Sequence, residues 1–84
     1  NGEMVEKLAT EKKTKKLVVK AEIKKGALKI ILKDNNKNDI LTVNLDNNTK
    51  SLNKNIKDEF GKGQYIINYN GKNVENGKLE LIFQ

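Results

Sequence analysis

Apolar side chains recur at every second position along most of this chain. The pattern begins at Leu17 and continues to Ile23. It returns in four later segments, which are 28–32, 41–45, 65–69 and 79–83, and more weakly in 52–60, where Lys54 and Asp58 interrupt it. Successive side chains of a β-strand point to opposite faces, so this alternation is typical of strands with one buried face. It therefore predicts an all-β fold, an antiparallel β-sandwich of about seven strands, with no helix after residue 16.

Short groups of turn-forming residues separate these segments. Asn70-Gly71 and Asn76-Gly77 are turn-favouring pairs, and the first predicts a type I′ hairpin. The run 34–39 (DNNKND) has oxygen-bearing side chains at alternate positions, as calcium loops have. It lacks the turn glycine and the bidentate glutamate that such loops require. We therefore interpret this run as a plain turn.

The first fourteen residues differ from the rest of the chain. They are mostly polar, and Met4, Val5 and Leu8 are their only sizeable apolar side chains. We expect residues 1–14 to form a tether or an edge strand. A short helix is the alternative, because Glu, Lys, Leu and Ala are good helix formers. Residues 15–84 are predicted to form a single sandwich domain, since a chain of this length makes only one domain.

The composition argues against catalysis. The chain contains no His, Cys, Arg or Trp, and Ser51 is its only serine. These residue types supply most nucleophiles, general bases and soft metal ligands. The neighbouring carboxylates Asp58 and Glu59 point to opposite faces of a strand, which suits a solvated pair and not a glycosidase centre. We expect a protein that is not an enzyme and has no catalytic residues, cofactor or metal.

Lysines outnumber acidic residues and give the chain a formal net charge of +6. Most of the excess lies between Lys7 and Lys33, where ten lysines face only two glutamates. Two interpretations stay open: a solvated face that keeps the protein soluble, and contact with an anionic membrane or wall polymer. Nucleic acid fits poorly, since its readers use arginine forks and aromatic platforms. The candidate anionic-surface contacts are Lys12, Lys13, Lys15, Lys16, Lys20 and Lys24.

Several aliphatic residues fall out of phase with the predicted inner faces. If the strands are ordered as in variable-type immunoglobulin sandwiches, four isoleucines lie side by side on one outer face. Contiguous exposed apolar patches usually mark association sites, so this face is a candidate contact with a protein partner or in a homodimer. The alternatives are that the N-terminal segment covers the face, or that scattered aliphatics are tolerated there. The four residues are Ile31, Ile40, Ile66 and Ile82.

The segment 61–67 (GKGQYII) resembles the entry to strand F of immunoglobulin-like domains. The resemblance implies a tyrosine corner, in which the Tyr65 hydroxyl bonds back to the backbone. It also implies that Ile67 takes the place of the second core cysteine, and that strands F and G span 63–70 and 77–84. The strand-C tryptophan and both cysteines of antibody domains are absent, which excludes a domain of that type.

The whole layout resembles the small sandwich domains of uncharacterised envelope lipoproteins from low-GC Gram-positive bacteria. The segments that carry the resemblance are KAEIKKGALKIILKD, GKGQYIINYNGKN and GKLELIF. It implies a non-enzymatic extracellular or cell-surface interaction module, the soluble part of a lipoprotein whose lipid-bearing cysteine would precede residue 1. A carbohydrate-binding accessory domain of a larger surface protein is the alternative. No segment approaches the roughly 18 apolar residues of a membrane span, so we expect no transmembrane segment here.

Overall fold

The computed structural model describes residues 2–84, and this part of the chain forms seven strands and no helix. All strand pairs are antiparallel. The predicted all-β fold of two antiparallel sheets is therefore confirmed. The strands are β1 (Gly2–Thr10), β2 (Thr14–Glu22), β3 (Lys25–Lys33), β4 (Asp39–Leu45), β5 (Ser51–Phe60), β6 (Gly63–Glu75) and β7 (Lys78–Phe83).

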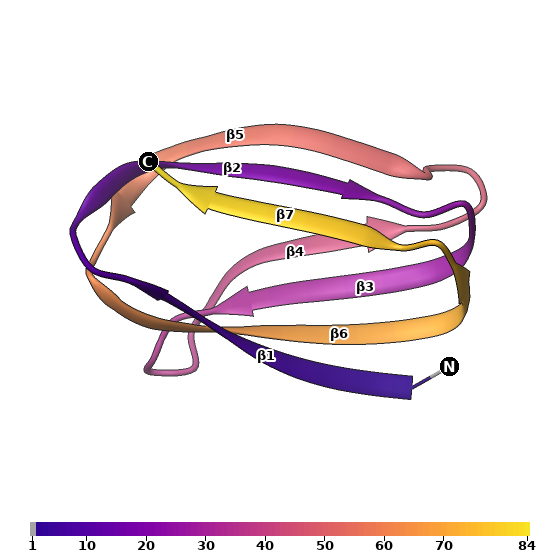
Figure 1. The fold of residues 1–84 in the computed structure, drawn as a ribbon, viewed down its shortest axis with the longest axis horizontal. Coiled ribbons are helices and arrows are strands. Elements are labelled where there is room, and N and C mark those ends of the chain that lie inside the picture. The colour runs from indigo at the N-terminus through magenta and orange to yellow at the C-terminus, as the bar shows by residue number, and fades with distance from the viewer. Residues whose placement is uncertain (1) are drawn as a thin grey trace.

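Two sheets face each other (Figure 1). The four-stranded sheet has the order β1-β6-β3-β4, and the three-stranded sheet has the order β5-β2-β7. Only β3 and β4 are consecutive strands within one sheet, so every other connection crosses from one sheet to the other. The molecule is elongated, with principal extents of 35 × 22 × 17 Å. The two chain ends lie at opposite ends of the long axis.

The core consists of the side chains that alternate toward the space between the sheets. Leu17 and Val19, in the central strand of the three-stranded sheet, have no exposed surface. Burying an aliphatic or aromatic side chain of this size contributes about 1.5–3 kcal/mol, which makes this layer the main source of stability. The other buried hydrophobic residues are Ala21, Ile23, Ile30, Leu32, Val43, Leu45, Phe60, Tyr65 and Ile67.

Residues 2–10 form the edge strand β1, which answers the open question about the N-terminal segment. β1 pairs with β6 along its whole length, from Gly2 opposite Gly71 to Thr10 opposite Gly63. Its side chains are the least buried of any strand, and Met4 and Val5 are 56% and 61% exposed. The segment is thus held mainly by backbone pairing to one neighbour.

The strand order on which the isoleucine patch depended does not occur. That order would place the final strand beside residues 63–70, but β7 pairs with β2 instead, with Ile82 opposite Val18. β1 takes the place beside β6. The predicted turn at Asn70-Gly71 does not form, because these residues lie inside β6 between β1 and β3. The chain reverses later, at Asn76, whose φ of 52° is that of a left-handed turn residue.

The connection from β2 to β3 depends on Gly26. This residue has a φ of 101°, a conformation that side chains rarely adopt. A Cβ atom at this position would clash with the backbone carbonyl of Asn73. The backbone N–H of Gly26 donates a hydrogen bond to Oδ1 of Asn47, at 3.1 Å. Gly26 therefore lets the start of β3 pack closely against β6 and the β4–β5 turn.

Candidate functional site

The Tyr65 hydroxyl donates a hydrogen bond to the carbonyl oxygen of Gly61, at 2.7 Å. This is the contact that the sequence motif implied. The Tyr65 ring is buried against Phe83 of β7, with 4.7 Å between the ring centroids, and Phe83 also meets Phe60 edge to face at 5.3 Å. Burial, followed by the charge of Asp34, raises the pKa of Tyr65 above its ordinary value. These contacts fix the β5–β6 turn, so Tyr65 has a structural role.

The four isoleucines do not lie together. Ile31 and Ile66 share the outer face of the four-stranded sheet, but Ile82 lies on the outer face of the other sheet and is 38% exposed. Ile40 is the extra residue of a bulge between β3 and β4, and it packs against the core. The predicted patch was wrong as a set because it assumed that the last strand pairs with β6 and that Ile40 faces outward.

A smaller apolar surface remains on the outer face of the four-stranded sheet. Val5 and Ile31 both lie opposite Asn68 of β6, one on each side, and Ile66 lies two residues before Asn68. A shallow hollow of about 330 Å³ beside them includes Val5, Ile31 and Asn68. The sequence did not predict that Val5 lies on this outer face, because apolar residues do not alternate in its segment.

The candidate lysines divide between the two ends of the molecule. Lys12 and Lys13 form the turn between β1 and β2, and Lys15 and Lys16 follow at the start of β2. Lys24 lies after the other end of β2, where its N–H bonds to the carbonyl oxygen of Glu75. Because β2 is extended, these residues cannot form one continuous patch. The candidate set was therefore too broad.

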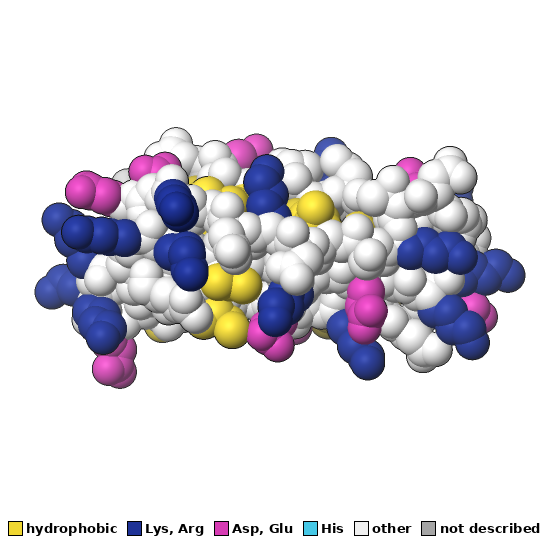
Figure 2. Space-filling view, turned by 90° about the horizontal axis from the view of Figure 1, so that it is seen from above, with side chains coloured by type: hydrophobic (Ala, Val, Ile, Leu, Met, Phe, Trp, Pro, Cys, Tyr) yellow, Lys and Arg dark blue, Asp and Glu magenta, His cyan; other side chains and the backbone are white. Residues whose placement is uncertain are grey.

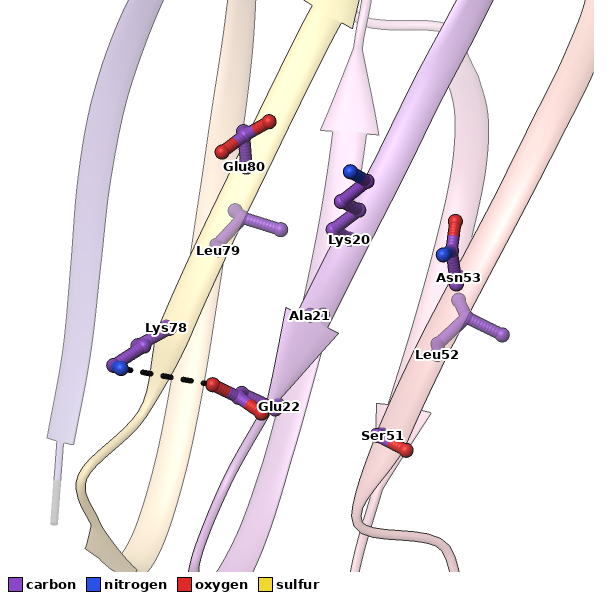
Figure 3. Close-up of a pocket in the computed structure, with 9 residues that line it drawn as sticks. All are labelled: Lys20, Ala21, Glu22, Ser51, Leu52, Asn53, Lys78, Leu79 and Glu80. Carbon is purple, nitrogen blue, oxygen red and sulfur yellow. Dashed lines mark ion pairs between the residues drawn. The ribbon is translucent and has the colours of Figure 1, made fainter.

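Lys20 lies between the two groups, on the outer face of the three-stranded sheet. It is opposite Asn53 on one side and Glu80 on the other, as Figure 3 shows. The next residues along this face are Glu22 and Lys78, which form an ion pair of 3.7 Å. Together they line a shallow hollow of about 540 Å³. Opposite charges alternate here, so this face is not a basic patch.

Two further lysines join the group at the β1–β2 turn. The pairs Thr10 with Gly63 and Thr14 with Phe60 bring the β1–β2 and β5–β6 turns together. Lys62 belongs to the β5–β6 turn, and Lys57 lies opposite Lys16. We call the resulting group the basic end, and it consists of Lys12, Lys13, Lys15, Lys16, Lys57 and Lys62.

Figure 2 shows lysine side chains at both ends of the molecule, with carboxylates among them. The carboxylates that the strand bounds place near the basic end are Glu11, Asp58 and Glu59, together with Asp34 and Asp39 at the β3–β4 turn. Of the two ion pairs found among residues 2–84, Lys33 with Asp39 lies beside the β3–β4 turn at this same end of the long axis, and Lys78 with Glu22 lies at the opposite end. The sequence could not reveal Lys57 and Lys62 as members, because residues 34–84 carry no net charge and only the fold brings them to this end.

The predicted turn at residues 34–39 is held by Asp34. Its carboxylate accepts hydrogen bonds from the backbone N–H groups of Asn36 and Asn38 and from the side chain of Asn38, at 2.9–3.1 Å. These bonds, led by that from the Asn38 backbone, lower the pKa of Asp34 below its ordinary value. No cluster of three or more metal-ligating side chains occurs in residues 2–84.

No protein-family model, curated protein or solved structure matches this chain. Among the residues that the structure describes, no helix is long and apolar enough to cross a membrane. Functional inference therefore depends on the geometry of the surfaces described above.

Proposed function

We propose that this protein is a non-enzymatic binding module of the bacterial cell envelope, and that its basic end contacts a phosphate-bearing polyanion. The observation that carries the proposal is the convergence of two turns, 50 residues apart in sequence, that places six lysines at one end of an elongated domain. The envelope location is supported by the resemblance to lipoprotein domains of Gram-positive bacteria.

The chemistry of the basic end suits a repeating anion. Lysine is a compact point charge on a flexible stem, so it contacts phosphates without the fixed geometry that arginine imposes. Each lysine near an anionic surface contributes about 1 kcal/mol, and the attraction falls off over about 8 Å at physiological ionic strength. Several lysines at one end can thus add a salt-dependent affinity for anionic lipid headgroups or a wall polymer.

The position of the basic end favours a polymer over the membrane of a lipid anchor. β1 runs the length of the domain and carries the chain from Gly2 to the β1–β2 turn at the far end (Figure 1). A domain attached to a membrane at residue 1 would therefore direct its basic end away from that membrane. A polyanion farther out, such as a wall polymer, is then the better partner.

The carbohydrate-binding alternative receives no comparable support. Such sites present exposed aromatic rings on which sugars stack, but Phe60 and Tyr65 are buried in the core. Tyr69 and Phe83 are half-buried and pack against the core cluster. The four aromatic side chains of the chain are thus engaged in packing.

Co-sedimentation with two probes tests the proposal. One is vesicles containing phosphatidylglycerol, and the other is polyglycerol phosphate on beads, each at low and high salt. The test variant is Lys12→Glu/Lys13→Glu/Lys62→Glu. The control, at the opposite end, is Lys24→Glu/Lys50→Glu/Lys72→Glu. Each variant changes the formal net charge from +6 to zero, because each of its three substitutions removes two positive charges.

We expect the low-salt affinity for polyglycerol phosphate to fall at least tenfold in the first variant and less than threefold in the second. High salt should remove most of the wild-type binding. Equal losses in the two variants would show that net charge, and not the basic end, is responsible. Binding to vesicles alone would favour a membrane partner, and no binding to either probe would refute the proposal.

A further inference from the structure

One strand of the four-stranded sheet has no strand opposite it. The ring contact between Tyr65 of β6 and Phe83 of β7 places β7 over β6. β1 lies beyond β6, and β7 is the last strand of its own sheet on this side. The inner face of β1 is therefore uncovered toward its N-terminal end, and this explains the 56% exposure of Met4.

A groove of about 580 Å³ occupies this place, between β1 and β7. Apolar side chains from both sheets line it, with Met4 from β1 and Leu79 from β7 among them. A polar pair lies in the groove as well, since the Tyr69 hydroxyl donates a hydrogen bond to Oε2 of Glu6, at 3.2 Å. The other main apolar residues of the lining are Leu28 and Val74.

The free edge of β7 borders this groove. β7 pairs only with β2 among the described strands. In an antiparallel strand, half of the backbone N–H and C=O groups point to each side, so the outer half of β7 has no strand partner. Its inward side chains, Leu79, Leu81 and Phe83, are all apolar. Such an edge is a template for the addition of another strand.

The other three edge strands carry an inward-pointing charge or a bulge, and β7 carries neither. These are two of the devices that discourage strand addition. Glu6 of β1 lies opposite the buried residue Ile67, so its side chain is on the inner face of the sheet. Lys54 of β5 lies opposite the buried residue Val19 and is on the inner face for the same reason. β4 has the bulge at Ile40. β7 pairs in unbroken register and has no inward charge.

We propose that β7 and the groove accept an extended segment of a partner polypeptide, which joins the three-stranded sheet as a fourth strand and covers β1. The length of β7 indicates a segment of about six residues. Every second side chain should be apolar, to pack on Met4 and Leu79. One lysine or arginine should lie opposite Glu6, because a carboxylate that loses water needs a cationic partner.

A second folded copy of this chain does not fit the same position. Pairing β7 with its symmetry mate would bring the mate's β6, which lies under its β7, into the space that β1 occupies. A single extended strand has no such second layer. The geometry thus selects an isolated segment over a homodimer. This inference is independent of the basic end.

Selection from a phage-displayed library of random heptapeptides tests the inference. The matched variants are Met4→Lys and Val5→Lys, neighbours on β1 that are both more than half exposed and point to opposite faces. Neither side chain belongs to the buried core, so both variants should fold. Amide NMR shifts and hydrogen exchange of the complex then locate the bound peptide.

We expect enriched peptides in which apolar residues alternate and a basic residue recurs. Their affinity should fall at least tenfold in Met4→Lys and stay within about twofold in Val5→Lys. Protection from exchange should appear at β7 amides. The inference would be overturned by the absence of enrichment, by equal effects of the two variants, by shifts confined to β4 or β5, or by a dimer in analytical ultracentrifugation of the free protein.

Discussion

Tyr69 and Glu6, which are 63 residues apart in sequence, join β6 to β1 through a hydrogen bond of 3.2 Å on the inner face of the four-stranded sheet. Burial, then the charge of Glu6 and this hydrogen bond, raises the pKa of Tyr69 to about 12. The bond is a side-chain link between the rest of the sheet and a strand that is otherwise held mainly by its backbone.

This link predicts an alkaline dependence of stability. The unfolded chain releases the Tyr69 proton near its ordinary pKa of 10.0, and the folded protein retains it to about 12. The contribution of Tyr69 is therefore complete below pH 10 and is lost as the pH rises from 10 to about 12. Tyrosinate absorbance in a Tyr65→Phe background should report a single late titration.

In the same background, Glu6→Gln should lower the pKa of Tyr69, because the negative charge is gone. The pKa should stay above 10, since burial, the largest cause, remains. An unchanged titration would show that Glu6 does not contact Tyr69 in solution.

The buried hydroxyl of Thr14 predicts that a substitution which removes it stabilises the protein. Its hydroxyl is buried, with 5% of the residue exposed, and has no hydrogen-bond partner in the protein. A buried hydroxyl without a partner costs about 1–3 kcal/mol. Thr14→Val keeps the shape and removes the hydroxyl, so the free energy of unfolding in urea should rise by about 1 kcal/mol or more. Thr42→Val, at an exposed position of β4, should change it by less than about 0.5 kcal/mol.

The close packing at Gly26 predicts that adding a single methyl group there causes a severe loss of stability. Gly26→Ala would place a methyl group against the Asn73 carbonyl in a backbone conformation with positive φ. Strain of this kind costs about 1–3 kcal/mol before the clash is counted, so the free energy of unfolding should fall by at least about 2 kcal/mol. Gly61→Ala is the control, because no atom lies within 4 Å of a Cβ there. Comparable losses in the two variants would contradict the close packing at Gly26.

The hydroxyl of Tyr65 should contribute to stability separately from its ring. Tyr65→Phe keeps the ring against Phe83 and removes the hydrogen bond to Gly61. The free energy of unfolding should fall by about 1 kcal/mol, the usual contribution of a neutral hydrogen bond. Hydrogen exchange should quicken around the β5–β6 turn and stay unchanged at the β3–β4 turn. A uniform change across both turns would argue against a local role.

The sequence predicted which residues face the core, because a period of two assigns every side chain of a strand to a face. Leu17, Val19 and Ala21 are buried as their alternation predicted. The same period carries no information about neighbours, so the pairing of β7 with β2 could not be derived from it. The error about Ile40 has a different cause, since one extra residue in a bulge turns a side chain to the other face.

The surfaces were harder to predict than the core. The basic end needs Lys57 and Lys62, which join Lys16 only through the pairing of β2 with β5 and the meeting of two turns. The groove needs β1 and β7, which lie at opposite ends of the sequence and in different sheets. Local patterns of charge or hydropathy do not predict which residues far apart in sequence become neighbours.

The opposite placement of the two chain ends has a mechanical consequence. Tension applied through both ends would draw β1 along β6 and β7 along β2, parallel to the strands. The hydrogen bonds of antiparallel pairs run across the strands, so the force would load many of them together in shear and would not unzip them one by one. A domain connected in this way would resist stretching in a chain under load.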